Sequence, residues 1–154
     1  MTSRLTVVLV SLLLATPAVI FWVWLMILPA RIVIQCPEEC RCQQEGFNLN
    51  CSDSALNIIP SILPTHARTL VLNGNNITYF ANRSFVSRGL VDLHLLKADF
   101  CELRKIELGA FNGLTKLTFL SVQNNEISEI IPGTFEKISQ LEYLNLDHNI
   151  IANL

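Results

Sequence analysis

Four closely spaced cysteines carry the clearest chemistry in this sequence. They follow the spacing Cys-x3-Cys-x-Cys-x8-Cys at Cys36, Cys40, Cys42 and Cys51. Thiols at this spacing form disulfides in an oxidising compartment, whereas a similar cluster in the cytosol would indicate a zinc site. The chemistry of the cluster therefore depends on whether the chain is exported.

The first 30 residues indicate export. Arg4 precedes a largely apolar run over residues 5–28, an order typical of a segment that directs a chain into the secretory pathway. Two alternatives remain open: a signal peptide cleaved after Ala18 or Ala30, or a transmembrane signal anchor, since about 20 apolar residues span a bilayer. Both place residues 32–154 in the lumen or outside the cell, so we expect disulfides and no metal.

A repeat of 24 to 26 residues fills the rest of the chain and must position any functional group. It reads L-x-x-L-x-L-x-x-N-x-I/L-x-x-I/F-x4-F and begins at Ala67, Leu93, Leu117 and Leu141. This is the leucine-rich repeat signature. One unit buries too little apolar surface to offset the entropy of ordering it, so the units must stack. The sequence predicts a curved solenoid with a parallel β-sheet on its concave face, an irregular or 3-10 convex side, and an apolar helix before it.

The expected organisation follows from these segments. It comprises the leader at 1–30, a cysteine-rich cap at 36–66, and repeats at 67–92, 93–116, 117–140 and 141–154. The fourth repeat is incomplete, so we expect the chain to be a fragment of a protein with more repeats and a membrane tether. The two extra residues of the first repeat fall in 86–92, on the convex or lateral side, where they leave the strand register intact.

The cap resembles that of a known group of proteins. The run Cys-Pro-Glu-Glu-Cys-Arg-Cys, followed by Leu56, Ile59, Pro60, Leu63 and Pro64, is similar to the N-terminal cap of extracellular leucine-rich repeat proteins such as Slit, the Nogo receptor and neuronal adhesion proteins. The resemblance implies the disulfides Cys36–Cys42 and Cys40–Cys51, and a receptor or adhesion role. Such a cap would cover the first apolar layer of the solenoid.

No constellation of catalytic residues emerges from the repeat. Cys101 occupies the position held elsewhere by Asn75, Asn125 and Asn149, so we expect a buried free thiol, with a disulfide to a part of the protein outside this chain as the alternative. The three histidines fall at different repeat positions, which leaves the thiol without a base. With a net charge of −2 and no basic field, the chain does not suit nucleic acid. We expect neither enzymatic activity nor a cofactor.

Outward positions of the strands form the candidate binding face. Leu95, Phe119 and Tyr143 share one column, which we expect to lie beside Phe100. Exposed apolar and aromatic residues often mark partner sites, although they could instead pack sideways and strengthen the sheet. The expected partner-binding residues are Leu95, Lys97, Phe100, Phe119, Ser121, Gln123, Tyr143, Asn145 and Asp147.

Two further features concern the exported surface. The triplets beginning at Asn76 and Asn82 are glycan acceptor sequences, expected to point away from the concave strands, whereas Asn50 adjoins a half-cystine and is weaker. The favoured function is protein–protein recognition on the concave face of a cell-surface receptor or adhesion protein. The alternative is a small matrix protein that binds collagen or glycans; the sequence lacks a dense basic stripe that would favour it.

Overall fold

The computed structural model describes residues 36–44 and 47–152. The chain divides into two units, Met1–Val33 and Ile34–Leu154, and the described residues all belong to the second. The apolar helix expected over 1–30 lies outside the described residues. Within 36–44 and 47–152, no helix has the length and apolarity that a membrane crossing requires.

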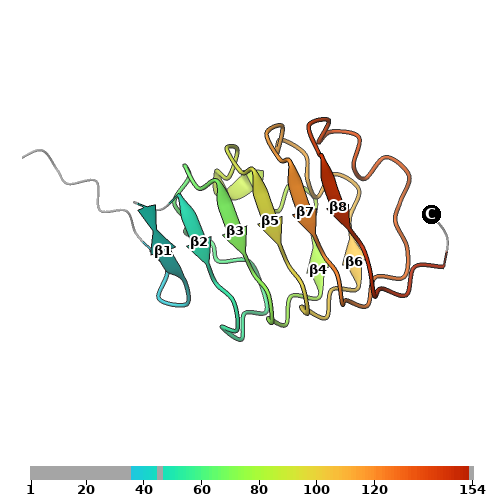
Figure 1. Cartoon of the computed structure of the whole chain (residues 1–154), viewed down its shortest axis with the longest axis horizontal. Coiled ribbons are helices and arrows are strands. Elements are labelled where there is room, and N and C mark those ends of the chain that lie inside the picture. The colour runs from blue at the N-terminus through green and yellow to red at the C-terminus, as the bar shows by residue number, and fades with distance from the viewer. Residues whose placement is uncertain (1–35, 45–46, 153–154) are drawn as a thin grey trace, which may run out of the picture. The chain divides into compact units, whose positions relative to one another are not determined.

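Six short strands form the main sheet. They are β1 (Arg41–Gln43), β2 (Asn48–Asn50), β3 (Thr69–Val71), β5 (Leu95–Lys97), β7 (Phe119–Ser121) and β8 (Tyr143–Asn145). The β1–β2 pair is antiparallel and every later pair in this sheet is parallel. Figure 1 shows these strands side by side in chain order. This is the predicted leucine-rich repeat solenoid, with the sheet on its concave face.

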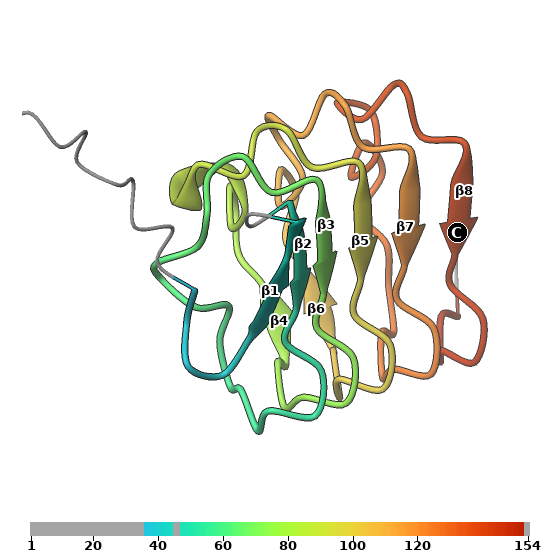
Figure 2. The same cartoon turned by 60° about the vertical axis from the view of Figure 1, so that its left-hand side comes forward.

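A second, smaller sheet lies on the side of the solenoid opposite the main sheet. It pairs β4 (Tyr79–Phe80) with β6 (Lys105–Ile106) in parallel, and the turned view in Figure 2 shows this pair behind the main sheet. The rest of the convex side is irregular apart from η2, a 3-10 helix at Val86–Arg88. Such short pieces match the irregular convex side that the sequence predicts.

The strand register keeps the repeat leucines in line. Leu70, Leu96, Leu120 and Leu144 pair across successive strands. The two extra residues of the first repeat lie around η2. This helix ends at Arg88 and is capped by Gly89, which has a φ of 77°. A side chain there would be strained, and a Cβ atom would lie 2.6 Å from Cγ2 of Thr65. Strands β3 and β5 stay paired on either side of this insertion, so the register is intact, as predicted.

Leucines and phenylalanines fill the interior of the coils. Phe80, Phe85 and Phe111 are fully buried on the convex side, and the ring of Phe111 stacks on that of Phe135 with 5.8 Å between centroids. Contacts of this kind between coils bury the apolar surface that no single repeat can bury alone. The repeat leucines are less buried in the last coil: Leu144 is 39% exposed, whereas Leu120 is fully buried.

The repeat asparagines satisfy backbone groups at the turns. Oδ1 of Asn125 accepts hydrogen bonds from the amides of Cys101 (2.9 Å) and Leu103 (3.0 Å). Its Nδ2 donates to the carbonyl oxygens of Ala98 (2.8 Å) and Val122 (2.9 Å). One side chain thus ties two coils together and satisfies backbone groups that would otherwise be unpaired.

Cys101 fills the same position with a thiol. It is free and fully buried, as predicted, and its Sγ donates to the carbonyl oxygen of Leu72 at 3.1 Å. Burial raises the pKa of this thiol above its ordinary value. The side chain therefore acts as a small, protonated core residue that keeps one of the asparagine hydrogen bonds.

The cap continues the solenoid at its N-terminal end. Cys36 bonds to Cys42, and Cys40 bonds to Cys51, which confirms the pairing that the resemblance implies. Strand β2 pairs in parallel with β3, and Leu49, in the middle of β2, is 1% exposed. The cap thus covers the first repeat with its own strand, as expected.

Candidate protein-binding face

The register brings the apolar column together on the concave face. Leu95 pairs with Phe119, and Phe119 pairs with Tyr143. The rings of Phe119 and Tyr143 stack with 4.4 Å between centroids and 8° between planes. The side chains do pack sideways, yet Tyr143 remains 47% exposed. The apolar column (Leu95, Phe119 and Tyr143) is therefore both a contact within the sheet and an accessible aromatic surface.

Lys97 adds a positive charge beside this column. Its Nζ lies 5.3 Å from the centroid of the Phe119 ring, within the range of a cation–π contact. Lys97 is the third residue of β5 and is half-buried. The positive charge of Lys97 therefore lies beside the aromatic surface of the column.

Asp99 lies at the centre of a hydrogen-bonded network at the ends of the strands. Its carboxylate is buried, and Oδ1 accepts hydrogen bonds from Oγ of Ser121 (2.6 Å) and the amide of Gln123 (3.1 Å). Ser121 is only 3% exposed. The expectation that Ser121 faces a partner is therefore wrong, because its hydroxyl is used to satisfy a buried carboxylate.

The network extends across all four repeats. In the first repeat, Oδ1 of Asn73 accepts from the amide of Asp99 at 2.9 Å. In the fourth, Nδ2 of Asn145 donates to Oε1 of Gln123 at 3.0 Å and to the hydroxyl of Tyr143 at 3.4 Å. We call these residues the concave polar network (Asn73, Asp99, Ser121, Gln123 and Asn145). The network contacts the apolar column through Tyr143, so hydrogen bonds within the chain hold the side chains of this face in place.

Two members of this network were missed as site residues. Asn73 and Asp99 occupy the same repeat position as Gln123 and Asp147, and four polar residues at one repeat position are the signal that would have found them. Asp147 itself is exposed, and its amide donates to Oδ1 of Asn145 at 2.8 Å. Polar side chains at this position therefore run along the whole concave face.

Phe100 is not beside the apolar column. It has a positive φ of 57°, as have Gly74, Asn124 and His148 at the same repeat position, and its amide donates to the carbonyl oxygen of Gln123 at 3.2 Å. It therefore lies in the turn beyond the end of β5, whereas Leu95 begins that strand. Its side chain is 60% exposed, so it belongs to a separate part of the surface.

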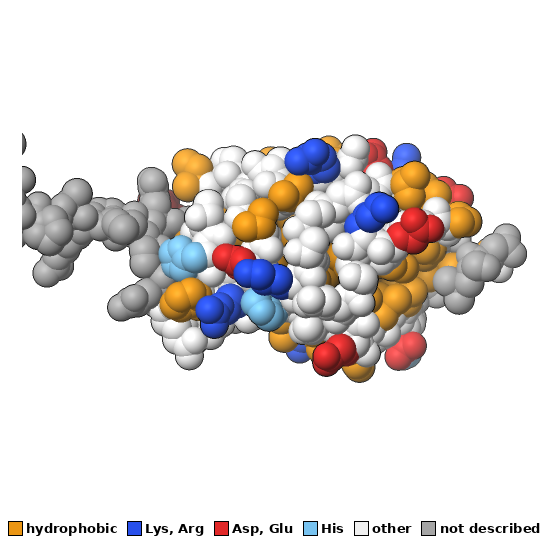
Figure 3. Space-filling view, turned by 90° about the horizontal axis from the view of Figure 1, so that it is seen from above, with side chains coloured by type: hydrophobic (Ala, Val, Ile, Leu, Met, Phe, Trp, Pro, Cys, Tyr) orange, Lys and Arg blue, Asp and Glu red, His pale blue; other side chains and the backbone are white. Residues whose placement is uncertain are grey.

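Charges of both signs meet at the edge where the strands begin. Asp92 forms an ion pair with Lys116, and that hydrogen bond and charge lower the pKa of the Asp92 carboxyl, with smaller effects from Arg68 and His94. Figure 3, which views the molecule from above, shows basic, histidine and acidic side chains close together on one part of the surface. A mixed cluster of this kind is not the basic stripe that a polyanion would need.

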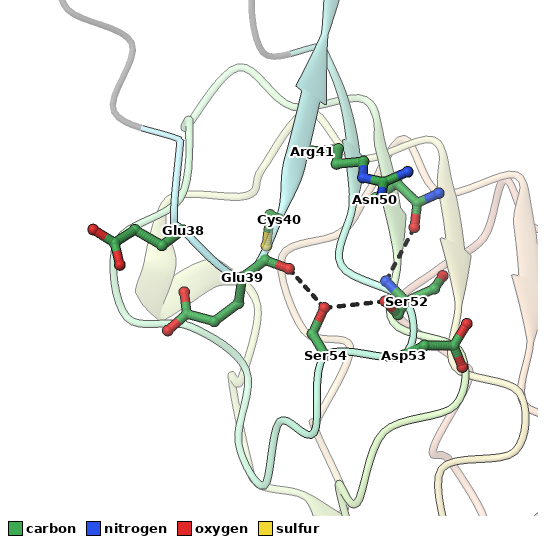
Figure 4. A pocket seen from close by; sticks show the side chains of 8 residues that line it. All are labelled: Glu38, Glu39, Cys40, Arg41, Asn50, Ser52, Asp53 and Ser54. Carbon is green, nitrogen blue, oxygen red and sulfur yellow. Dashed lines mark hydrogen bonds between the residues drawn. The ribbon is translucent and has the colours of Figure 1, made fainter.

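A polar cavity lies in the cap. It measures about 500 Å3 and is lined by Glu38, Glu39, Cys40, Arg41, Asn50, Ser52, Asp53 and Ser54. Figure 4 shows Ser54 between Glu39 and Ser52, and its Oγ lies 2.7 Å and 3.0 Å from their carbonyl oxygens. The amide of Ser54 also donates to Oδ1 of Asn75 at 3.1 Å. The first two bonds hold the cap together and the third fastens it to the first repeat, which gives this cavity a structural explanation.

The glycan acceptor residues lie away from the strands of the concave face. Among residues 36–44 and 47–152, no group of three His, Cys, Asp or Glu side chains could hold a metal ion. Asn76 and Asn82 are exposed and lie on the segments that follow β3, on either side of β4. Glycans on these residues would leave the main sheet free, as expected from the repeat.

Comparisons with known proteins agree on the repeat. Residues 88–151 match the family model described as Leucine rich repeat. Trophoblast glycoprotein from Macaca fascicularis is 31% identical over 84 residues, 54% of this chain and 20% of that protein. Leucine-rich repeat-containing G-protein coupled receptor 5 from Xenopus tropicalis is 36% identical over 91 residues, 58% of this chain and 10% of that protein. Leucine-rich repeat-containing protein 3B from Homo sapiens is 33% identical over 93 residues, 60% of this chain and 35% of that protein.

A solved structure shows the same architecture. The crystal structure of human 5T4 (Wnt-activated inhibitory factor 1, Trophoblast glycoprotein) superposes with a TM-score of 0.68 at 28% sequence identity, over 78% of this chain and 43% of that chain. This chain thus spans between a tenth and about a third of the length of the curated relatives described above. The family model covers residues 88–151, which include the concave strands β5, β7 and β8.

Proposed function

This chain is a leucine-rich repeat protein with a disulfide-bonded N-terminal cap, and we propose that it binds a protein partner on its concave face, outside the cell. The two disulfides point to an extracellular or secretory location. Repeat proteins of this kind serve as protein-interaction modules through their extended concave surfaces. A cell-surface receptor or adhesion role is the form of this function that we favour, with segment 1–30 as the membrane anchor if it is not cleaved.

The stacked rings of Phe119 and Tyr143 carry this proposal. Aromatic side chains are enriched in the cores of protein interfaces and among the residues that dominate binding energy. Here the two rings are held by each other and by adjacent strands, so a partner would order them at little entropic cost. An apolar partner residue would fit against the exposed part of Tyr143, and a partner carboxylate would fit near Lys97.

The neighbouring polar groups would give the contact its specificity. Gln123 and Asn145 are half-buried and already bonded to each other, and Asp147 is exposed beside them. A partner whose polar groups become buried here without forming hydrogen bonds would bind more weakly, because unsatisfied polar groups cost free energy. The proposed site therefore comprises Leu95, Lys97, Phe119, Gln123, Tyr143, Asn145 and Asp147, with Ser121 and Asp99 as support beneath it.

The test compares two tyrosines of the same chain. The full chain is expressed in mammalian cells and screened against cell-surface proteins, together with Tyr143→Ala and the control Tyr79→Ala. Tyr79 lies on β4 and is 51% exposed, against 47% for Tyr143, so the two substitutions remove similar exposed rings from different sheets. We expect Tyr143→Ala to weaken binding by about 2 kcal/mol or more, as at an interface hot spot. A partner that binds Tyr143→Ala as tightly as the unmodified chain, and loses affinity for Tyr79→Ala, would show that the concave face is not the site.

A further inference from the structure

A small cavity on the smaller sheet joins an exposed tyrosine to a glycan acceptor. It measures about 180 Å3, and Tyr79, Ile58 and Asn82 lie among its lining residues. Tyr79 is 51% exposed and Ile58 is 61% exposed. Pockets for drug-sized ligands measure roughly 300–1,000 Å3, so this cavity suits a smaller group, on the scale of a single sugar ring.

Arg88 also lines the cavity. Its Nε donates to the carbonyl oxygens of Pro60 (3.0 Å) and Ile59 (3.3 Å), and its Nη1 donates to the carbonyl oxygen of Ser84. These bonds hold the guanidinium in place and leave Nη2 without a hydrogen bond to the described part of the chain. The lining of the cavity thus combines apolar side chains with a guanidinium held by backbone carbonyl groups.

Asn82 lines this cavity, and hydrogen bonds to the second repeat hold its backbone. Its amide donates to Oε2 of Glu107 at 2.8 Å, and the next residue, Arg83, has a positive φ of 57°. The amide of Arg83 donates to the carbonyl oxygen of Gly109 at 3.0 Å. The turn is therefore fixed between two repeats, while the Asn82 side chain stays exposed.

The first sugar of an N-linked glycan matches the chemistry of this cavity. The ring of N-acetylglucosamine presents C–H groups on its faces, which pack on the face of an aromatic ring, and its N-acetyl oxygen accepts hydrogen bonds. Tyr79 and Ile58 offer the apolar surface, and Arg88 offers the donor. Asn82 is itself a lining residue. Its Oδ1 lies beside Gly109 of the next coil, so the attached sugar enters the cavity once the carboxamide turns toward Tyr79.

We propose that the first N-acetylglucosamine of a glycan on Asn82 packs in this cavity against Tyr79. The surface around Tyr79 is then a receptor for the chain's own glycan, which shields it from other proteins and ties the cap segment to the first repeat. This inference rests on glycosylation of Asn82. It is independent of binding on the concave face, which lies on the other sheet.

Nitration of tyrosine tests the packing within a single molecule. The chain contains two tyrosines, Tyr79 and Tyr143, so Tyr143 is an internal reference. The full chain is expressed in cells that make only high-mannose glycans, treated with tetranitromethane, and mapped by mass spectrometry. Relative to Tyr143, we expect Tyr79 to be nitrated about three- to tenfold more slowly when Asn82 carries its glycan, the change expected for a modest ring contact. Trimming with endoglycosidase H, which leaves one N-acetylglucosamine, should preserve this protection.

Two variants separate the packing from other effects. Asn82→Gln should abolish the protection of Tyr79, whereas Asn76→Gln, which removes the neighbouring acceptor outside the cavity, should preserve it. Equal nitration of Tyr79 in the trimmed glycoprotein and in Asn82→Gln overturns the proposal. If Asn82 of the secreted or displayed chain carries no glycan, the proposal also fails, while the concave-face proposal stands on its own experiment with Tyr143→Ala.

Discussion

The ring of Tyr143 lies nearly parallel to that of Phe119, one strand away, with 4.4 Å between their centroids. This contact joins the third and fourth repeats on the surface that we propose for binding. It is therefore expected to contribute to folding as well as to recognition, and the two contributions can be separated by measurement.

The stacked pair should show energetic coupling in the folded protein. We expect the double-mutant cycle of Phe119→Ala and Tyr143→Ala to give a coupling of about 0.5–1.5 kcal/mol in urea unfolding, because each ring loses its stacking partner in the single variants. Tyr143→Phe keeps the ring and should retain most of this coupling. Additive effects of the two alanine substitutions would show that the rings do not stabilise each other.

Asp99 should be the most sensitive polar residue of the concave face. Asp99→Ala leaves Oγ of Ser121 and the amide of Gln123 without their acceptor, so we expect a loss of about 2–4 kcal/mol of unfolding free energy. Asp147→Ala, at the same position of the next-but-one repeat but exposed, is the matched control and should change stability by about 0.5 kcal/mol or less. Similar losses for both residues in chemical denaturation would contradict the network.

Cys101 should tolerate the residue that the other repeats use. Cys101→Asn adds an acceptor for the turn of the preceding coil, so we expect a gain of up to about 1 kcal/mol, whereas Cys101→Ala removes the bond to Leu72 and should be destabilising. Because burial raises the thiol pKa, the folded chain should resist iodoacetamide at neutral pH and react only after unfolding. Rapid alkylation of the folded chain would show that the thiol is accessible.

The two cap disulfides should differ in their contribution. On the chain-entropy model, removing Cys40–Cys51, with a sequence separation of 11, should cost about 3 kcal/mol, and removing Cys36–Cys42, with a separation of 6, about 2 kcal/mol. Cys40 and Cys51 are also buried, which adds to the difference. Thermal unfolding of the paired alanine variants measures it, and a larger loss for Cys36–Cys42 would contradict this order.

The ion pair of Asp92 and Lys116 should be visible by titration. The pair lowers the pKa of the Asp92 carboxyl, so its contribution to stability is present above the unfolded value of about 3.9 and is lost as the pH falls through the lowered value. Lys116→Gln should raise the carboxyl pKa toward that ordinary value in an NMR titration. An unchanged pKa in Lys116→Gln would assign the shift to another group.

The repeat pattern predicted the fold well because each repeat places the same residue types at the same positions. The positions of Leu70, Leu96 and Leu120 set the register, and Asn125 bonds to the backbone of two successive coils. The pairing of the cysteines came from the resemblance of the cap, since spacing alone leaves three pairings open.

The two errors within the site have different physical causes, and alternation along a strand reveals neither. Alternation along a strand tells which way a side chain leaves the backbone, but it does not tell what the neighbouring coil places over it. Ser121 leaves on the concave side and is nevertheless buried, because Asp99 of the preceding coil requires its hydroxyl. Phe100 was misplaced because its left-handed backbone conformation puts it in the turn, beyond the strand to which alternation applies.

The insertion at η2 shows that the two sides of the solenoid can change separately. The first repeat is longer than those after it, yet its strand stays in line with the next one. Evolution, or a protein engineer, can therefore lengthen the convex segment of a repeat without changing the strand on the concave face. The spacing of the residues offered to a partner is set by hydrogen bonds between strands, whatever the length of the loops that return between them.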